Sequence, residues 1–246
     1  FGGYGNACYQ WQYARQFTIY NDVVYIADTY GKKVKSLTLT GQCKDIWFTG
    51  QYPHAIAANS NYVFVGHPSN SISVLDHRLN QRTTQSINSN YLSYAWGMSI
   101  NPAGNKLAIA DYNKNHVVEF SISGDWLTYT QKTSSTYSSG NGYFQRPTDT
   151  GYDSSGNIYV ADLYAHRVQK FNSSLVYQAK VGSYSTSSGF RYPYGMYVDS
   201  NDKIYATDFY NYAVRQYDTS LSETATYGGG AGTRLSAAKK VIKKIV

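Results

Sequence analysis

The chain has 246 residues, of which 22 are Lys or Arg and 15 are Asp or Glu, so its formal net charge is +7. Hydrophobic residues make up 42% and charged residues 15%, which excludes an intrinsically disordered chain. With 27 tyrosines, aromatic and β-branched residues dominate the apolar set and favour strands over helices. No run of about 18 apolar residues occurs, so we expect no membrane-spanning helix. The excess of Lys and Arg over Asp and Glu points to nucleic acids or anionic membranes as candidate partners.

Cysteine usage is the first clue along the chain. Cys8 and Cys43 lie 35 positions apart in a sequence that is rich in Tyr, Ser, Asn and Gly. This combination predicts one disulfide formed in an oxidising compartment, and hence a secreted or cell-surface protein. The alternative is two unrelated buried thiols. A structural zinc site is excluded, because it needs about four ligands and two thiols alone cannot build it. The chain begins at Phe1, as we expect of a processed or trimmed form.

Internal repetition decides the predicted fold. Four segments read alike, each an apolar strand that ends in Asp and is followed within two residues by Tyr. They are residues 24–30, 107–113, 158–164 and 204–210, with a degenerate fifth at 63–68. The column Asp28, His67, Asp111, Asp162 and Asp208 has spacings of 39, 44, 51 and 46 residues. A period of roughly 40–50 residues rich in short strands indicates a β-propeller with one four-stranded blade per repeat.

Each repeat is predicted to hold four strands. A first apolar strand, as at 147–153, is joined by a tight turn to the strand that ends in Asp. A short loop leads to a third strand, as at 167–171, and a more polar fourth strand follows, as at 174–180. Inner strands pack between blades and outer strands meet solvent, so this order suits a blade. We therefore predict an all-β domain over residues 1–233, a β-propeller of four-stranded antiparallel blades.

Residues 146–171 and 192–217 resemble the NHL-repeat family almost throughout. The resemblance lies in the Pro-initiated first strand, the turn, the Tyr-Val-Ala-Asp strand and the Arg-Val strand. It extends over about residues 14–230, is weak in the second repeat, and implies a propeller that in this family usually has six blades. Five repeats are visible here. We favour a sixth blade built from residues 5–13 and part of 235–246, and five self-closing blades are the alternative.

The aspartates of the column are predicted to be structural rather than catalytic. Asp28, Asp111, Asp162 and Asp208 each end a strand, and a carboxylate there can accept backbone N–H bonds from the loop to the third strand.

The resemblance also includes an enzyme branch, the amidating lyase of peptide-hormone maturation, whose zinc ligands come from Pro-His starts of inner strands. The equivalent column in this chain reads Arg15, His54, Trp96, Thr148 and Tyr194. One His in five positions cannot make a three-ligand zinc site. We therefore lean towards a protein that is not an enzyme, with no catalytic residue, metal or cofactor. Arg15, His54, Trp96, Asp149 and Tyr194 become candidate binding residues at the channel mouth.

An enzymatic alternative stays open. Calcium-dependent lactonases, a related propeller class, surround a central cation with oxygen ligands. Asp149 is the one carboxylate at a channel-facing position, since Glu119 and Glu223 are predicted on outer strands. The alternative function is thus a metal-dependent lyase or hydrolase centred on His54 and Asp149.

Tyrosine supplies the main argument for binding, because it combines an apolar ring with a polar tip. Tyr30, Tyr112, Tyr164 and Tyr210 follow the Asp column on one propeller face. Tyr91, Tyr94, Tyr143, Tyr184 and Tyr192 precede inner strands, and we place them on another face. The leading hypothesis is a non-enzymatic extracellular binding or assembly module for a protein, peptide or glycan. The alternative reading is that these rings fill space between blades.

Residues 234–246 differ in kind from the rest, with five cations and no acid. Their spacing predicts a short cationic amphipathic helix that would lie on an anionic surface or dock on a partner protein. A closing strand is the alternative. Residues 1–233 then carry 17 basic and 15 acidic residues, a net charge of +2, which makes an RNA-binding propeller a weaker second alternative. Homo-oligomerisation is left open.

Overall fold

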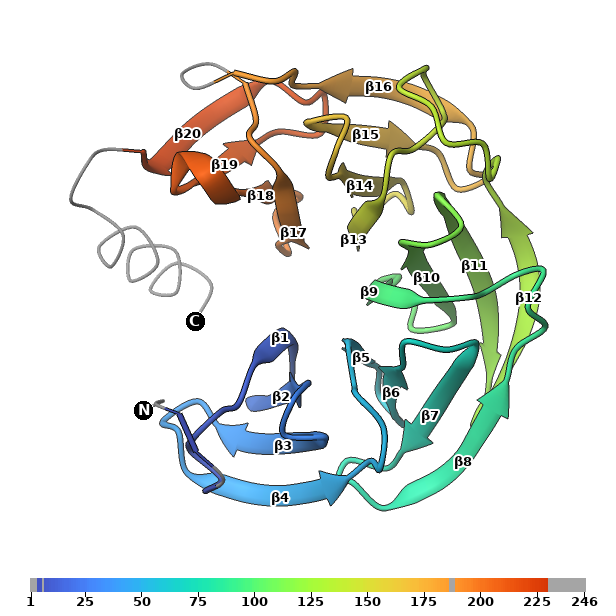
Figure 1. Cartoon of the computed structure of the whole chain (residues 1–246), viewed down its shortest axis with the longest axis vertical. Helices are drawn as coiled ribbons and strands as arrows, with labels where there is room; N and C mark the ends of the chain where they lie inside the picture. Colours follow the sequence, from blue (N-terminus) through green and yellow to red (C-terminus); the bar gives the residue numbers. More distant parts are fainter. Residues whose placement is uncertain (1–3, 6, 186–188, 230–246) are drawn as a thin grey trace. The chain divides into compact units, whose positions relative to one another are not determined.

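The protein is described here by a computed structural model that covers residues 4–5, 7–185 and 189–229. These residues form 20 β-strands and one short 3-10 helix, arranged as five four-stranded antiparallel sheets (Figure 1). None of the described residues belongs to a helix long and apolar enough to cross a membrane. The predicted all-β class and four-stranded antiparallel blades are confirmed.

The first three sheets follow one another in the chain. The first contains β1 (Ala14–Tyr20), β2 (Val23–Asp28), β3 (Lys33–Thr38) and β4 (Cys43–Phe48). The second contains β5 (Ala55–Ala58), β6 (Val63–Gly66), β7 (Ser71–Leu75) and β8 (Gln81–Ser86). The third contains β9 (Ala95–Ile100), β10 (Lys106–Asp111), β11 (His116–Ser123) and β12 (Trp126–Lys132).

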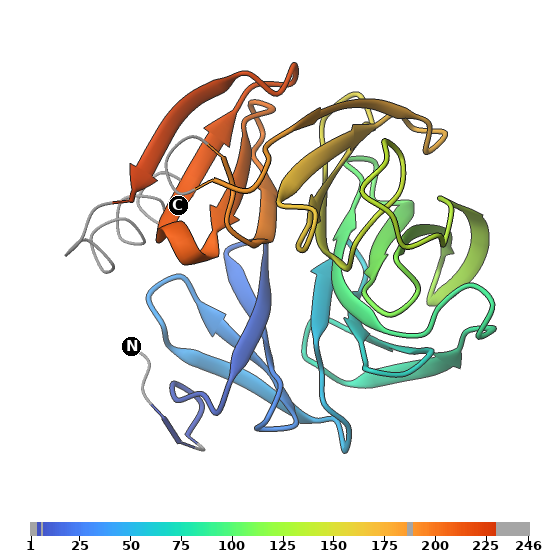
Figure 2. The same ribbon diagram turned by 45° about the horizontal axis from the view of Figure 1, so that its top comes forward.

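The last two sheets repeat this order. The fourth contains β13 (Pro147–Tyr152), β14 (Ile158–Asp162), β15 (Arg167–Phe171) and β16 (Tyr177–Val181). The fifth contains β17 (Pro193–Val198), β18 (Ile204–Asp208), β19 (Ala213–Tyr217) and β20 (Glu223–Gly228), with the 3-10 turn Phe209–Asn211 after β18. Strands pair in sequence order within every sheet, as the views in Figures 1 and 2 show.

The chain divides into two compact units. Unit 1 comprises residues 1–111 and 118–130, and unit 2 comprises residues 112–117 and 131–246. Among their described residues, unit 1 therefore holds the first two sheets and most of the third, and unit 2 holds the last two. The predicted division into 1–233 and a tail at 234–246 has its second part outside the described residues.

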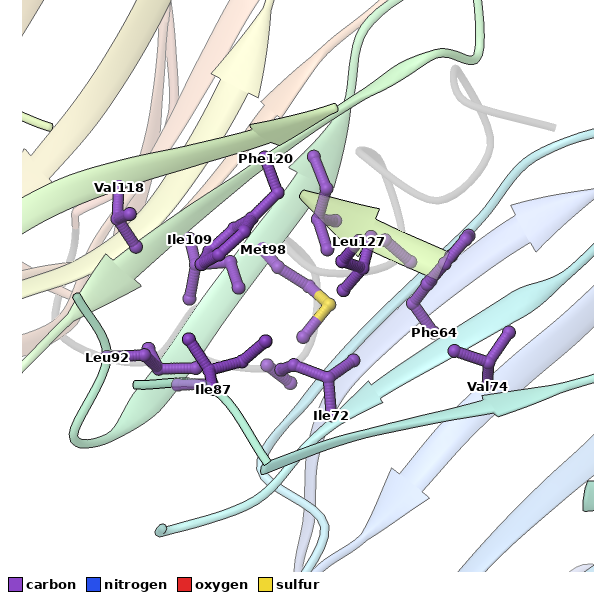
Figure 3. Packing of buried hydrophobic residues seen from close by; sticks show 14 residues of the cluster. Phe64, Ile72, Val74, Ile87, Leu92, Met98, Ile109, Val118, Phe120 and Leu127 are labelled. Atoms are coloured by element: carbon purple, nitrogen blue, oxygen red, sulfur yellow. The ribbon is translucent and has the colours of Figure 1, made fainter. Parts of the chain in front are cut away.

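Strands of one sheet differ in burial. All five residues of β14 are buried, whereas β16 alternates between half-buried and exposed positions. In unit 1 the buried core gathers Phe64, Met98, Ile109 and Phe120 from neighbouring sheets (Figure 3). In unit 2 the corresponding cluster includes Tyr159, Phe190 and Tyr217. Removal of this apolar area from water stabilises each unit, at roughly 25 cal/mol per Å².

The two ends of every sheet have different chemistry. We call the end with the hairpin turns that join the first and second strands, and the third and fourth, the turn end. The opposite end, with the loop between the second and third strands and the segment before the first strand, is the loop end. Asn21 and Asp22 form the first turn with φ values of 52° and 59°, a left-handed conformation that these residue types tolerate and that matches strand twist.

Three expectations need adjustment or confirmation. The described residues contain five sheets, which the five-blade alternative accounts for. The favoured sixth blade was to combine residues 5–13 with part of 235–246; the described residues of 5–13 belong to none of the five sheets, and 235–246 lies outside the described part. The fourth strand predicted at 174–180 begins later, at Tyr177, because Asn172 closes a turn by accepting the backbone N–H of Ser174 and Val176. Cys8 and Cys43 form the predicted disulfide, with their Cα atoms 5.7 Å apart.

Candidate functional site

The aspartate column organises the loop end of its sheets. Asp28 accepts the backbone N–H groups of Gln12 and Tyr13 at 2.8 and 3.0 Å. Asp111, Asp162 and Asp208 accept those of Ser93, Gln145 and Arg191 in the same way, at 2.6, 2.7 and 2.7 Å. The donors thus precede the first strand, and the prediction that they lie in the loop to the third strand was wrong. The reason is that the second strand ends beside the start of its antiparallel neighbour.

Three of these carboxylates are also held in buried ion pairs. Lys35 lies 3.0 Å from Asp28, Arg167 lies 2.9 Å from Asp162, and Arg215 lies 2.9 Å from Asp208. Burial raises the pKa of Asp162 to about 6, although the nearby Arg167 acts in the opposite direction. Their oxygens are engaged in holding the fold, an arrangement that accords with a structural role.

A pocket of about 320 Å³ opens at the loop end of unit 1. Its lining comes from the segments before β1, β5 and β9 and from the loops that follow β2 and β6. The lining residues are Tyr13, Arg15, Thr29, Tyr30, Tyr52, His54, Pro68 and Tyr94. The set contains one permanent cation, no carboxylate and four tyrosines.

Arg15 is the central charge of the pocket. It is the second residue of β1, and its Nη1 lies 2.8 Å from Nδ1 of His54. Its guanidinium carbon lies 3.7 Å from the centre of the Trp96 ring, in cation–π geometry. The planar cation is therefore held from two sides by residues that come from the starts of β5 and β9.

His54 is nearly buried and forms the floor that supports Arg15. The Tyr94 hydroxyl lies 3.1 Å from Nδ1 and 3.2 Å from Nε2 of the imidazole, and the Trp96 ring lies 5.6 Å away. Burial, reinforced by the neighbouring Arg15, lowers the pKa of His54 to about 4. The imidazole is neutral at pH 7, so Nδ1 accepts the guanidinium hydrogen bond.

Exposed rings form the rim of the pocket. Tyr30 is 61% exposed, and its ring lies 5.0 Å from that of Tyr13 and 6.3 Å from that of Tyr52. Lys32 lies 4.7 Å above the Tyr52 ring. Thr29 donates its hydroxyl to the Pro53 carbonyl at 2.7 Å, which ties the loop after β2 to the start of the second sheet.

The structure brings together four of the residues singled out from the sequence: Arg15, His54, Trp96 and Tyr30. Tyr13, Tyr52 and Thr29 were missed, although each stands next to a position that the repeat marks. Tyr94 was noticed but placed on a different face from Tyr30. That placement was wrong, because the segment before a first strand and the loop after a second strand lie at the same end of an antiparallel sheet.

The remaining candidates lie in unit 2. Asp149 is buried and accepts the backbone N–H of Thr150 at 2.9 Å and of Met196 at 3.0 Å, so it joins β13 to β17. Gln16 does similar work in unit 1, where it accepts the N–H of Ile56 at 2.8 Å and donates to the Met98 carbonyl at 3.1 Å.

Aromatic residues also gather at the loop end of unit 2. The Tyr192 ring lies 5.8 Å from Tyr164, 5.2 Å from Tyr210 and 4.6 Å from His166. Tyr194 lies 6.2 Å from Phe209. Tyr112 bonds to Tyr164, and burial together with this bond raises the pKa of Tyr112 to about 12. Predicted loop tyrosines 112, 164 and 210 therefore share one cluster with Tyr192, which was placed elsewhere.

The candidate residues have other partners than a metal ion. Within the described ranges, no three His, Cys, Asp or Glu side chains are grouped so as to hold a metal ion. Both Asp149 oxygens accept backbone hydrogen bonds, and His54 bonds to Arg15 and Tyr94.

Comparison with known proteins agrees with the fold. Residues 144–171 match the family described as NHL repeat. No curated protein matches the chain. Virginiamycin B lyase from Staphylococcus aureus is similar at 12% identity and a TM-score of 0.65, over 87% of this chain and 69% of that chain. A catalytically inactive form of that lyase with Quinupristin gives 13%, 0.67, 90% and 72% for the same quantities.

A third similar structure is a chain of a nidogen/laminin complex. It is 17% identical with a TM-score of 0.65, over 85% of this chain and 76% of that chain. Identities this low establish the fold alone, because one fold supports many activities. The neighbours include both a lyase and a protein of a binding complex.

Proposed function

Because the chain is an NHL-type β-propeller, we propose that it is a non-enzymatic binding module that acts outside the cell. It presents the loop end of its sheets, rich in tyrosine, to a glycan, a peptide or another protein. The observation that carries this proposal is the unit 1 pocket, with Arg15 supported by His54 and Trp96 and bordered by exposed tyrosines.

Recognition is the chemistry that this pocket supports best. A fixed cation, neutral hydroxyl groups and exposed ring faces orient a ligand but supply no activated nucleophile. Tyr and Arg are also the residue types enriched at sites that dominate binding energy. The Cys8–Cys43 disulfide supports the extracellular part of the proposal, since such bonds persist in oxidising compartments.

The test is a binding screen of the full chain against arrays of glycans and peptides, with hits measured by calorimetry. We expect Tyr30→Ala to weaken the best hit by about tenfold, which corresponds to roughly 1.4 kcal/mol. The matched control is Trp126→Ala, which removes a 57% exposed ring at the turn end of the third sheet. Equal losses for both variants, or no hit at any concentration, would refute a loop-end binding site.

An enzymatic function remains the second candidate, on one observation. His54 is neutral at pH 7 and lies against a tyrosine hydroxyl, an arrangement that general acid–base chemistry uses. The candidate is a metal-dependent lyase or hydrolase in which His54 takes part. Turnover assays on lactones and amidated-peptide precursors, with and without the metal found by analysis of the purified protein, decide between the two, because a binding module shows no metal-dependent turnover.

A further inference from the structure

Negative charge is distributed unevenly between the two ends of the sheets. Eight acidic side chains reach the surface, all at or next to a turn end: Asp22, Asp45, Asp76, Asp125, Asp199, Asp202, Asp218 and Glu223. The loop-end acids, Asp28, Asp111, Asp162 and Asp208, are 0% exposed. All 15 acids of the chain fall within the described residues, so no loop end presents a carboxylate to solvent.

Positive charge at the loop ends does reach solvent, and most of it lies against aromatic rings. Unit 1 carries Arg15, stacked on Trp96, and Lys32 above Tyr52. Unit 2 carries Arg146, 4.8 Å above Tyr112, and Arg191, 5.7 Å above Tyr210. Within each unit, therefore, the loop end combines cations with ring faces, and its potential favours an anionic ligand.

The unit 1 pocket narrows the ligand further. At about 320 Å³ it lies at the lower limit of small-molecule sites, so it holds one compact chemical unit. The planar fork of Arg15 matches a carboxylate. Tyr13, Tyr30 and Tyr52 line the same pocket and are exposed, and their hydroxyls are suited to a ligand that carries several hydroxyls of its own.

We infer that this pocket binds an acidic sugar residue, a hexuronic acid within a polysaccharide, with its carboxylate on Arg15 and its ring against the tyrosines of the rim. The inference rests on the proposed binding function and names its ligand class. A uronic acid unites a carboxylate, several hydroxyls and a compact ring, which matches each part of the lining. An Asp or Glu side chain of a peptide would contact the guanidinium but would not use the tyrosine hydroxyls. RNA would need many phosphate contacts, whereas the cations of unit 1 at this pocket are Arg15 and Lys32.

The experiment is calorimetric titration of the full chain with four probes. They are an oligosaccharide of hexuronic acid units, the same oligosaccharide with its carboxyl groups reduced to alcohols, poly-glutamate, and uridine-rich single-stranded RNA. We expect the uronic oligosaccharide to bind most tightly, and the reduced form to bind 10- to 100-fold more weakly, because a hydrogen bond to a charged group contributes about 1.5–3 kcal/mol.

Variants locate the carboxylate. Arg15→Gln should cause the same 10- to 100-fold loss, whereas Arg15→Lys should retain part of the affinity because it keeps the charge without the planar fork. Arg78→Gln, at the turn end of the second sheet, removes the same charge and should change affinity less than about twofold. Thermal melting checks that each variant folds. If Arg15→Gln does not fold, Tyr30→Ala tests the same pocket at an exposed position.

Each other outcome overturns the inference. Equal binding of the intact and reduced oligosaccharides would reject the acidic sugar while leaving a glycan-binding function intact. Tighter binding of poly-glutamate or RNA, lost in Arg15→Gln, would assign the pocket to a peptide or to nucleic acid. If Arg78→Gln weakens binding as much as Arg15→Gln, the attraction is a property of net charge and not of the pocket. If none of the four probes binds, yet a neutral ligand from the screen does, only the ligand class fails.

Discussion

Equivalent repeat positions do different work in the two units. At the starts of the first strands, unit 1 places Arg15, His54 and Trp96, which contact one another and support a pocket. At the same positions in unit 2, the Thr148 hydroxyl lies 3.4 Å from the Pro193 carbonyl, and Tyr194 packs near Phe209. The backbone places these side chains alike, so the difference arises from residue type. Equivalent positions of the repeat thus support a pocket or pack the fold according to the side chain that occupies them.

The largest expected effect concerns the aspartate column, which both units contain. Asp162→Ala leaves the buried Arg167 and the Gln145 N–H without their carboxylate, so we expect a loss of about 3–5 kcal/mol in the free energy of unfolding. Denaturant titration at pH 8 measures it. Asp125→Ala, at a half-exposed turn position, is the control and should change stability by less than about 0.5 kcal/mol. A similar small change for Asp162→Ala would show that the column does not hold the loop end.

A falling pH should destabilise unit 1. His54 and His67 in unit 1 are buried, and burial lowers the pKa of each from 6.5 to about 4. The unfolded chain takes up these protons more readily, so unit 1 should lose stability as the pH falls from about 6.5 to 4, by up to about 3 kcal/mol for each histidine.

The opposite sign is expected for a carboxyl in unit 2. Burial raises the pKa of Asp162 from 3.8 to about 6, so its protonation favours the folded state as the pH falls through that interval. Hydrogen exchange resolved by residue at pH 7 and 4.5 checks both signs. The variant His54→Gln/His67→Gln should remove the acid sensitivity of unit 1, and an unchanged pH profile would show that these histidines do not cause it.

A third comparison concerns the side chains that join first strands. Asp149→Asn turns one acceptor into a donor that faces a backbone N–H, of Thr150 or Met196, and should cost about 1–3 kcal/mol. In unit 1 the side-chain amide of Gln16 joins first strands by accepting one backbone hydrogen bond and donating another. Gln16→Glu should therefore lower stability by a similar amount, because its Nε2 bond to the Met98 carbonyl is lost. Unfolding of both variants by denaturant gives the comparison, and a neutral Asp149→Asn would mean that the bridge adds no stability.

The smallest effects concern the aromatic residues. Tyr192 contacts three rings at the loop end of unit 2, so Tyr192→Ala should cost about 1 kcal/mol or more of stability. Tyr30 is mainly exposed, so Tyr30→Ala should change stability by less than about 0.5 kcal/mol while it weakens ligand binding. Thermal melts of both variants, together with ligand titration of Tyr30→Ala, test whether unit 1 uses its rings for recognition and unit 2 for packing.

Much of the fold could be read from the repeat, and part of the site could not. Strands that end in Asp28, Asp111, Asp162 and Asp208 were expected at their observed positions, because the alternation of apolar residues and turn signals is local. The role of Tyr94 was not accessible in this way, since it depends on which end of a neighbouring sheet the segment before β9 reaches. Asp149 was a candidate binding residue at a channel-facing position, and the backbone bond that it accepts from Met196 became visible only with β17 in place.

By itself, the sequence determined the all-β class, the four-stranded repeat and the pairing of two cysteines, since each follows from local pattern or composition. Tertiary structure decided what the repeat positions do. Arg15, His54 and Trp96 are separated by 39 and 42 positions, and only the packing of three first strands brings the guanidinium to the imidazole and the indole. The same packing neutralises His54 by burial, so the character of this pocket comes from arrangement in space.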